Sequence, residues 1–375
     1  MKGVFYMKII VSQKELAKGI KSVARGVSAK TSLPILQGIK IVAKSDYLFL
    51  TGTNLDLTIE TKISCEIIKE GGCVLDAKML SSIISKLPSD DITISVEDGN
   101  AIITNSTSKF ELLTENVMEF PEPNIATDGN EIEIETDILL ECIRKVFSAI
   151  SDDNTRPILT GAKVEIENNT LTFVALDGYR LAYKSAIVNY DGTLDAVIPK
   201  AVLNEINRIL TTSKDIEDTH VTISSNLATF RLENTRISTR LLEGQFIDYK
   251  QLLKDTAKTV VTVNVNELKN SIERATILGK NTANNLVKLS FADGKVTIKS
   301  NSEIGKSVEE LETEKFVGED TIIAFNSMYL LDGIKGINSN EVKLYIDSSV
   351  QPMIMRESED EKSSIYLVLP VRLNN

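Results

Sequence analysis

Hydrophobic and polar residues alternate along residues 156–183, RPILTGAKVEIENNTLTFVALDGYRLAY, which predicts strands rather than helices. We expect strands over 158–166 and 170–176, joined by an Asn168-Asn169 turn, and a third strand opened by Asp177-Gly178. Asp-Gly between alternating apolar residues is a strong hairpin signal because both residues tolerate positive φ at the two central positions. The stretch therefore predicts a meander of three antiparallel strands.

The same pattern occurs upstream. Residues 33–61 align with this stretch at a constant offset of 123 residues, so that LPIL matches RPIL and Leu48 matches Leu171. A weaker third copy begins near Leu286, with Val296 in the place of Leu171. A fixed long period is typical of repeat architectures, and a chain of this length exceeds what one hydrophobic core usually supports. The sequence therefore predicts three similar domains, over residues 7–125, 131–252 and 259–375.

Each repeat is expected to open with a helix and to contain a second helix midway. In residues 13–27, an apolar stripe at spacings of four, three and four is formed by Leu16, Ile20, Val23 and Val27. A row of cations follows the same spacings about 200° around the helix, formed by Lys14, Lys18, Lys21 and Arg25. One face is therefore expected in the core and the other in solvent. The remaining helices are predicted over 76–87, 137–150, 200–210, 266–280 and 326–337.

Two turn-rich or aperiodic segments mark the boundaries between repeats. The first runs from Phe120-Pro121-Glu122-Pro123-Asn124 to Asp128-Gly129-Asn130, and the second is the polar stretch 254–258. No run of about 20 apolar residues and no signal peptide ahead of Met7 is present, so we expect a cytoplasmic protein without a membrane segment. The six residues before Met7 leave open whether Met1 or Met7 is the native start.

Composition adds three constraints. With 42% hydrophobic and 25% charged residues, the chain of 375 residues is typical of a soluble globular protein. Its cysteines, Cys65, Cys73 and Cys142, are odd in number and lack metal-site spacing, so we expect buried free thiols in a reducing compartment. The single histidine, His220, is expected to be structural or exposed, because no nucleophile elbow or histidine-based centre accompanies it.

The charge distribution points to a polyanionic partner. The net charge is −11, but the six predicted helices carry 14 Lys and Arg against 8 Asp and Glu, which leaves the rest of the chain near −17. If all six helices face one way, an acidic body carries a cationic face suited to sequence-independent phosphate contact. The alternative is that these are ordinary solvated helix faces. No nucleotide-binding or metalloprotease motif is present, and the acidic runs Glu309-Glu310 and 357–361 are typical of solvated loops. We therefore expect no catalytic residue, no metal and no cofactor.

Several segments together carry a family resemblance: the LPIL and RPIL blocks, ALDGYRLA, EGQFIDY over 243–249 and the terminal YLVLPVRL over 366–373. Over residues 7–373 the chain resembles the β subunit of bacterial DNA polymerase III, the replicative sliding clamp. The resemblance implies an α+β fold of three similar domains, with antiparallel sheets outside and two helices each inside. It also implies a head-to-tail homodimer that closes into a ring around duplex DNA, binds no nucleotide and acts as a processivity factor.

The implied partners are duplex DNA, the replicative polymerase, a clamp loader and other proteins that carry short clamp-binding peptides. Candidate DNA contacts are Lys14, Lys18, Lys21, Arg25, Lys30, Arg144, Lys145, Lys200, Arg208, Lys269, Arg274 and Lys335. The implied ring interface brings Lys109 and Phe110 of the first domain to Ile277 and Leu278 of the third, near Glu303, Glu309 and Glu310.

The family's pocket for partner peptides lies between its second and third domains. Carried over by motif, it comprises Leu159, Leu176, Gly178, Tyr179, Arg180, Leu181, Phe246, Ile247, Asn326, Tyr329, Ser349, Val368, Leu369, Pro370, Val371 and Arg372. The chain departs from the family pattern at Tyr179, Leu176 and Ile247, where His, a small or hydroxylic residue and Pro are common. Asn374-Asn375 also extend past the expected terminal Leu, so the detailed shape and peptide preference of the pocket are open.

Two other function classes remain open at this point. A non-enzymatic repeat scaffold would bind proteins without encircling DNA. A carboxylate-dependent hydrolase would need paired acidic residues at one site, and the sequence offers no such pair.

Overall fold

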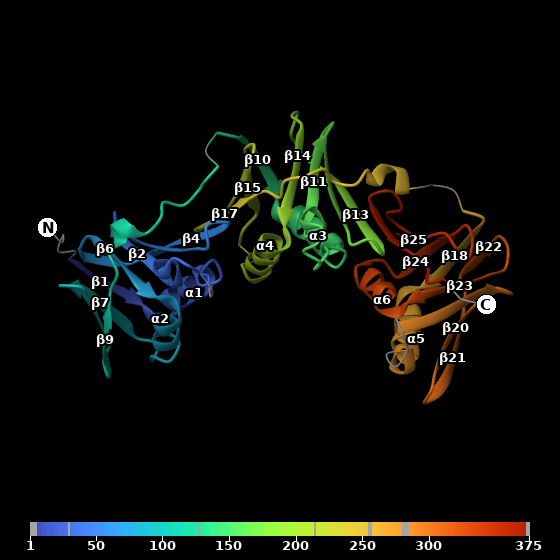
Figure 1. The fold of residues 1–375 in the computed structure, drawn as a ribbon, viewed down its shortest axis with the longest axis horizontal. Coiled ribbons are helices and arrows are strands. Elements are labelled where there is room, and N and C mark those ends of the chain that lie inside the picture. Colours follow the sequence, from blue (N-terminus) through green and yellow to red (C-terminus); the bar gives the residue numbers. More distant parts are fainter. Residues whose placement is uncertain are drawn as a thin grey trace. The chain divides into compact units, whose positions relative to one another are not determined.

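The computed structural model describes residues 6–28, 31–126, 128–213, 215–253, 257–279 and 285–372. Its Cα positions form two compact units (Figure 1), of which unit 1 comprises Met1–Thr136 with Arg208–Leu241 and unit 2 comprises Asp137–Asn207 with Leu242–Asn375. The three sequence repeats share one core order of strands and two helices, with one additional strand in repeats 1 and 3, and the second repeat is divided between the two units.

Repeat 1 contains α1 (Gln13–Val23), α2 (Ala77–Ile84) and the short 3-10 helices η1 (Pro34–Gln37) and η2 (Val117–Glu119). Its strands are β1 (Met7–Ser12), β2 (Gly38–Lys44), β3 (Tyr47–Thr53), β4 (Leu57–Ser64), β5 (Glu66–Lys69), β6 (Gly71–Asp76), β7 (Asp91–Glu97), β8 (Asn100–Thr104) and β9 (Lys109–Leu113).

Repeat 2 contains α3 (Thr136–Phe147), α4 (Lys200–Thr212), η3 (Pro157–Leu159) and η4 (Tyr249–Leu252). Its strands are β10 (Asn130–Glu135), β11 (Gly161–Glu167), β12 (Thr170–Leu176), β13 (Arg180–Ile187), β14 (Leu194–Pro199), β15 (Asp218–Ile223), β16 (Leu227–Leu232) and β17 (Thr235–Arg240).

Repeat 3 contains α5 (Val265–Gly279) and α6 (Ser327–Lys335). Its strands are β18 (Thr259–Asn264), β19 (Leu286–Ala292), β20 (Lys295–Ser302), β21 (Gly305–Glu312), β22 (Lys315–Val317), β23 (Thr321–Asn326), β24 (Glu341–Ile346), β25 (Met353–Glu357) and β26 (Ser364–Val368).

The repeat predicted from the sequence is present in the backbone. Strands β2 and β11 begin at Gly38 and Gly161, 123 residues apart, and each enters a hairpin with a two-residue turn. The turn residues Ser45-Asp46, Asn168-Asn169 and Asp293-Gly294 all adopt positive φ in the three copies. This is the geometry that a tight antiparallel hairpin requires.

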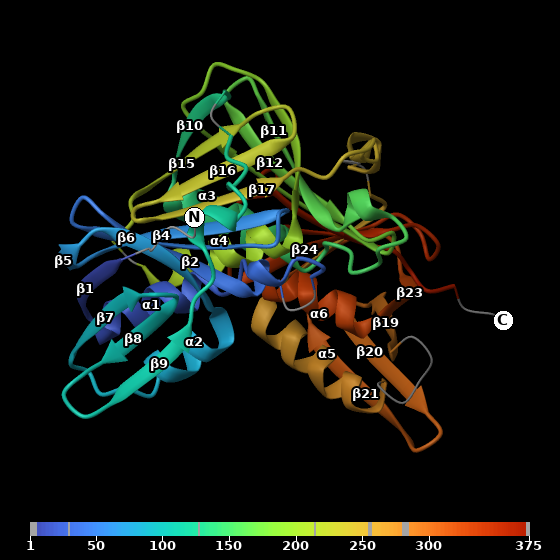
Figure 2. The ribbon, with the colours of Figure 1, turned by 60° about the vertical axis from the view of Figure 1, so that its left-hand side comes forward.

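Sheets continue across each boundary between repeats. In unit 1 an eight-stranded sheet has the order β10-β15-β16-β17-β4-β3-β2-β6, with β17 of repeat 2 paired to β4 of repeat 1. In unit 2 a nine-stranded sheet has the order β14-β11-β12-β13-β26-β25-β24-β18-β22, with β26 of repeat 3 paired to β13 of repeat 2. Two smaller sheets, β5-β1-β7-β8-β9 and β21-β20-β19-β23, end at β9 and β21 (Figure 2).

Each helix buries its apolar stripe against a sheet. In α1, Leu16, Ile20 and Val23 are buried, and a Cβ added to Gly19 would lie 2.9 Å from Leu50 of β3. In α5, Leu268, Ile272 and Ala275 are buried in the same way. None of the helices in the described part of the chain has the length and hydrophobicity that a membrane span requires.

Several predicted boundaries are wrong. Each repeat opens with a strand (β1, β10 or β18), not with a helix. The helix predicted over 13–27 ends at Val23, because the chain tightens into i→i+3 bonds such as Gly26 N to Val23 O, at 3.0 Å. Gly26 is required there, since a Cβ would lie 2.5 Å from the carbonyl oxygen of Gly52.

The other helices shift by a few residues. The helix predicted over 137–150 ends at Phe147 in the same tightened turn, and Asp76 and Asn326 are caps that precede helices α2 and α6. The strand predicted over 158–166 begins only at Gly161, because Pro157 starts a 3-10 helix. The end of the helix predicted over 266–280 and most of the polar stretch 254–258 lie outside the described residues.

The Asp177-Gly178 turn differs from the prediction at one residue. Gly178 has a φ of +90°, but Asp177 does not adopt positive φ. Its Oδ1 instead accepts the backbone N–H groups of Tyr179 and Arg180, at 2.9 and 3.0 Å. Asp177 therefore contributes to this turn through its side chain, as Asx turns do.

Candidate docking pocket and cationic helix faces

Unit 2 contains an apolar hollow of about 430 Å³ at the seam where β13 pairs with β26. Its lining comprises Leu176, Gly178, Arg180, Leu181, Ile247, Gln251, Leu252, Tyr345, Asp347, Gln351, Pro352, Ile354, Leu367 and Leu369. Apolar surface dominates, and a few polar groups stand at the rim, which is typical of ligand and peptide pockets.

The innermost lining residues of the hollow, which form its floor, belong to a hydrophobic core cluster. Leu176, Leu181, Ile354 and Leu367 are each less than 8% exposed and belong to this cluster with Leu159 and Phe246. The floor is therefore held by a packed core on both sides of the seam between repeats 2 and 3. Ile247 (41% exposed) and Leu369 (38% exposed) contribute apolar surface at the rim.

An aromatic and cationic group borders the hollow. The rings of Tyr179 and Tyr329 stack with centroids 5.8 Å apart, and the Arg180 guanidinium lies 4.5 Å from the Tyr329 ring centroid. Arg180 pairs with Asp177 and Asp332, at 3.0 and 2.5 Å. Burial alone would lower the pKa of Arg180, but its hydrogen bonds and the nearby acidic groups raise it, so this side chain is a fixed cation.

Six of the sixteen predicted pocket residues line the hollow: Leu176, Gly178, Arg180, Leu181, Ile247 and Leu369. Leu159 and Phe246 lie in the core cluster, and Val368 is buried in β26. Tyr179 and Tyr329 form the aromatic border, and Asn326 caps α6 through Met328 N, at 2.9 Å. Within the described chain, Ser349, Pro370, Val371 and Arg372 lie outside this lining.

Sequence reasoning missed eight lining residues: Gln251 and Leu252 of repeat 2, and Tyr345, Asp347, Gln351, Pro352, Ile354 and Leu367 of repeat 3. The repeat offered one signal, because Leu367 belongs to the last strand, where it pairs with Ile354 of β25 on one side and lies beside β13 on the other. These pairs can be assigned only when the register of the strands is known.

The equivalent seam of unit 1 lacks this apolar floor. The hairpin registers place Thr53 and Thr58 at the positions of Leu176 and Leu181. They likewise place Thr229 and Ser238 at the positions of Ile354 and Leu367. These hydroxyls are buried and bond in pairs, Thr53 to Thr58 at 2.8 Å and Thr229 to Ser238 at 3.0 Å.

The chain itself covers the hydroxylated seam. The backbone N–H of Ala126, a buried residue of the segment between repeats 1 and 2, donates to Thr229 Oγ1 at 3.0 Å. Buried polar groups are satisfied there by each other and by the covering segment. Between the two seams, as far as the structure describes them, the apolar hollow lies at the seam of unit 2.

The cations predicted for DNA contact differ in exposure. Lys14, Lys18 and Lys21 of α1 are exposed opposite its buried stripe, and Arg25 is exposed after the helix end. Arg144, Arg274 and Lys335 are also exposed, whereas Lys200, Arg208 and Lys269 are half-buried. Lys30 lies outside the described residues.

Lys145 does not lie on a cationic surface. Its side chain is 6% exposed and forms an ion pair with Glu357, whose side chain is 9% exposed. Arg274 and Lys200 remain closer to solvent but are paired with Glu309 and Asp152. Lys145 was predicted as a DNA contact together with its sequence neighbour Arg144, but its ion pair with Glu357 is buried in unit 2.

The residues predicted for the ring interface lie on strand β9 in unit 1 and on or near strand β21 and helix α5 in unit 2. Lys109 and Phe110 are exposed on β9 of unit 1. In unit 2, Glu309 and Glu310 lie on β21, Glu303 precedes this strand, and Leu278 of α5 lies beside Gly305. Ile277 is 68% exposed on α5.

All three cysteines are free; Cys73 and Cys142 are buried as predicted, but Cys65 is half-exposed. Burial raises the pKa of Cys73 and of Cys142 to about 12. Among the residues that the structure covers, no group of three or more His, Cys, Asp or Glu side chains is arranged to hold a metal ion.

Three family models of the DNA polymerase III beta subunit match the chain: its N-terminal domain over residues 7–125, its central domain over 133–248 and its C-terminal domain over 250–372. The chain belongs to the DNA polymerase III beta subunit family. The resemblance deduced from its motifs and the predicted α+β fold of three similar domains are thereby confirmed.

Relatives in this family carry the name beta sliding clamp. The beta sliding clamp of Bacillus subtilis is 34% identical over 98% of this chain and 100% of its own length. The crystal structure of the Bacillus subtilis DNA polymerase sliding clamp has a TM-score of 0.94 at 32% identity, covering 98% of this chain and 100% of that one. The Pseudomonas aeruginosa sliding clamp bound to griselimycin has a TM-score of 0.93 at 25% identity, with the same coverage.

Proposed function

We propose that this chain is a DNA sliding clamp. Two copies form a head-to-tail ring around duplex DNA, a clamp loader places the ring, and the replicative polymerase and other proteins dock on it through short peptides. The protein catalyses no reaction and acts in the cytoplasm as a processivity factor. Its domains are those predicted, residues 7–125, 131–252 and 259–375, a division supported by the three matched family segments.

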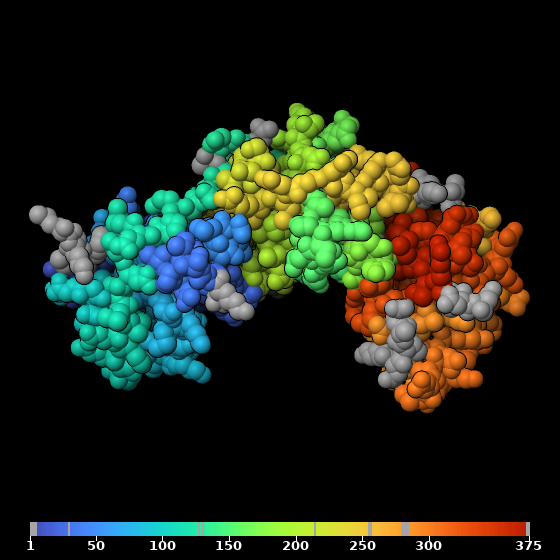
Figure 3. Space-filling view, viewed as in Figure 1, coloured from blue at the N-terminus to red at the C-terminus, as the bar shows by residue number. Residues whose placement is uncertain are grey.

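The proposal rests mainly on two edge strands, β9 and β21, each of which has a neighbouring strand on one side only in the ranges that the structure describes. At both boundaries inside the chain, the last strand of one repeat pairs with the fourth strand of the preceding repeat: β17 with β4, and β26 with β13. The corresponding strands of repeats 1 and 3 are β9 and β21, and each is the edge strand of a sheet within its own unit. Figure 3 shows the surface of these repeats, coloured by residue number. Pairing of β9 with β21 of a second copy would repeat the same joint, and a heterologous joint that closes by rotation makes a ring.

The strand registers at the two boundaries inside the chain predict the register of this joint. In the hairpin that ends each repeat, the same position is occupied by Phe110, Ile237 and Tyr366 in repeats 1, 2 and 3. Their internal partners Ile59 and Ala182 correspond to Ser307 of β21. We therefore expect Phe110 of one copy opposite Ser307 of the other. Glu111 would then face Lys306, and Lys109 would lie diagonal to Glu310, both pairs of opposite charge.

Cysteine cross-linking tests this joint. Phe110→Cys with Ser307→Cys, in a Cys65→Ser background, should form an intermolecular disulfide on mild oxidation. Directly opposed strand residues lie within disulfide reach, whereas a two-residue offset exceeds it. Phe110→Cys with Glu309→Cys is the matched off-register control. A protein that stays monomeric by sedimentation and forms neither disulfide contradicts the ring, and cross-linking of the control alone contradicts the register.

The cationic helices would face the DNA. Eleven of the twelve predicted contacts are described, and we leave out Lys145 because it is buried against Glu357. The remaining cations would attract the phosphate backbone without reading bases, so the ring would slide, and topology rather than affinity would retain it.

The hollow of unit 2 would hold the partner peptide. Each Leu or Phe anchor buried there stabilises the complex by roughly 1.5 to 3 kcal/mol. A few anchors give a dissociation constant near micromolar, about −8 kcal/mol, which permits exchange of partners. The relative bound to griselimycin suggests that molecule as a probe for this hollow.

Two exposed isoleucines of unit 2 give a matched test of the hollow. Ile247→Asp places a charge on the rim and should weaken griselimycin binding at least tenfold by calorimetry, since an apolar contact worth about 1.5 kcal/mol is lost. Ile187→Asp makes the same change on β13 at a residue that is 73% exposed and outside the lining, and should leave binding unchanged. Equal affinities for the two variants would place the binding site elsewhere.

A further inference from the structure

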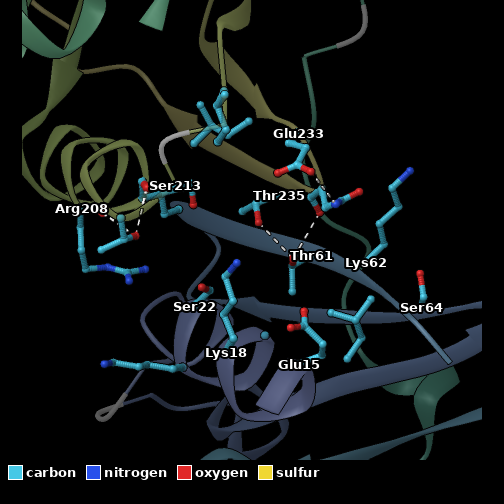
Figure 4. A pocket seen from close by; sticks show the side chains of 18 of the residues that line it. Glu15, Lys18, Ser22, Thr61, Lys62, Ser64, Arg208, Ser213, Glu233 and Thr235 are labelled. Atoms are coloured by element: carbon cyan, nitrogen blue, oxygen red, sulfur yellow. Dashed lines mark hydrogen bonds between the residues drawn. The ribbon is translucent and has the colours of Figure 1, made fainter. Parts of the chain in front are cut away.

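Unit 1 contains a second hollow, of about 480 Å³, on the helix side of its large sheet. It lies among α1, the end of α4, β4 and the turn between β16 and β17. In the close view, Lys18 extends from α1 and Arg208 from α4 toward the same space (Figure 4). Lys21 and Lys62 complete four cations in the lining, against the two acidic residues Glu15 and Glu233.

Hydroxyl groups surround these cations. Ser22 and Ser213 stand beside Lys18 and Arg208 in the close view (Figure 4), and Thr61 and Thr235 close the sheet side of the hollow. Positive charge together with hydroxyl donors is the usual composition of a contact with nucleic-acid phosphate.

Unit 2 contains the counterpart of this hollow, which provides an internal comparison. A cavity of about 510 Å³ lies between α3 and α6. The strands that lead into the helices align α3 with α1 and α6 with α4. Arg144 then corresponds to Lys21 and Lys335 to Arg208, but Glu141 stands in the place of Lys18.

The charges of the counterpart cancel. Its lining holds Arg144, Lys145 and Lys335 against Asp137, Glu141 and Asp332. The Lys145 charge is also neutralised by Glu357, outside this lining. The two hollows therefore share a position in the repeat, but the lining of the first is net positive whereas the lining of the second is neutral.

We propose that the hollow in unit 1 is a seat for backbone phosphates of nucleic acid and that its counterpart in unit 2 is not. This inference rests on the proposed clamp function and sharpens it, because it concentrates DNA contact on the seam of α1 and α4. The other cations then contribute to the general field without holding a phosphate.

Salt dependence distinguishes a local phosphate seat from general charge. The probe is a short fluorescent duplex, and its affinity for the protein is measured by anisotropy across a potassium chloride series. Each neutralised phosphate contributes about −0.9 to the slope of log K against log salt. Lys18→Gln with Arg208→Gln should therefore reduce the steepness by roughly 1.8.

Arg144→Gln with Lys335→Gln removes the same formal charge from the counterpart seam. It should change the slope by less than about 0.45, which is half the contribution of one phosphate contact. Lys18→Gln with Lys21→Gln, both exposed on α1, gives a second test in case Arg208 supports folding, and should also flatten the slope. Equal slopes for the two seam variants would overturn the inference while leaving the clamp intact. Equal retention of the wild-type protein on closed circular and on linear duplex would instead overturn the proposed function.

Discussion

The buried pair of Lys145 and Glu357 separates a structural cation from a DNA-contacting one. Both side chains are less than 10% exposed, and Glu357 also accepts the backbone N–H of Asn338 at 2.9 Å. Lys145→Ala would leave a buried carboxylate with that single N–H donor. Breaking a buried pair in this way costs roughly 3 to 5 kcal/mol, since the remaining charge stays desolvated.

The assay is urea unfolding of the full-length protein, followed by a signal that reports on unit 2. A loss of about 4 kcal/mol corresponds to roughly a thousandfold change in the unfolding equilibrium. Lys145→Met with Glu357→Met removes both charges and should recover most of the loss. Lys335→Ala, at an exposed cation of α6, is the control and should change the free energy of unfolding by less than about 0.5 kcal/mol.

The double variant Lys145→Met/Glu357→Met also tests whether Lys145 contacts DNA. Folded Lys145→Met/Glu357→Met protein should keep the wild-type salt slope for duplex binding, because neither charge faces solvent. A stability loss below about 1 kcal/mol for Lys145→Ala, together with a slope flattened by about 0.9, would refute the structural role and return Lys145 to the DNA-binding set.

Three further outcomes are expected. Lys109→Glu should weaken the dimer more at low than at high salt, because it opposes Glu310 across the proposed joint; unchanged sedimentation would contradict that pairing. Iodoacetamide should modify Cys65 but not Cys73 or Cys142 in the native protein, as mass spectrometry can show, because burial raises the pKa of the latter two to about 12. Hydrogen bonds to Ser363 and Lys184 lower the pKa of Asp360 although burial would raise it. Its contribution to stability is therefore full above the ordinary carboxylate pKa and is lost as the pH falls through the lowered value, so Asp360→Asn should flatten the acid side of the melting-temperature profile.

The repeat was readable from the sequence because it rests on local chemistry. The residues Asn168-Asn169 and Ser45-Asp46 tolerate the positive φ that a tight turn needs, and the 3.6-residue stripe of α1 marks its buried face. Such signals lie within a few residues of one another. They predicted the hairpins, the helices and the offset of 123 residues between the first two copies.

Helix ends were less predictable because tertiary contacts decide them. Gly26 packs so closely against Gly52 that a Cβ added to Gly26 would lie 2.5 Å from the Gly52 carbonyl oxygen. This contact determines where α1 ends and the tighter turn begins. Nothing in residues 13–27 alone identifies Gly52 as the neighbour. Similarly, Asp177 looked like a backbone turn residue, but its side chain caps the turn instead.

The candidate site was predicted in part for the same reason. Motif matching found Leu176, Leu181 and Leu369, which lie in the quoted segments, but not Ile354 or Pro352, which reach the hollow only through the pairing of β25 with β26. Lys145 was misplaced because its partner Glu357 lies 212 residues away in sequence. Pairings of that range are invisible to periodicity.

In the proposed function, two copies of this chain enclose duplex DNA. The direct measurement is retention of labelled protein on closed circular duplex after loading by a clamp loader, in high salt, before and after the circle is cut once. We expect stable retention on the circle and rapid loss on linearisation. Equal retention on circular and linear DNA would contradict encirclement.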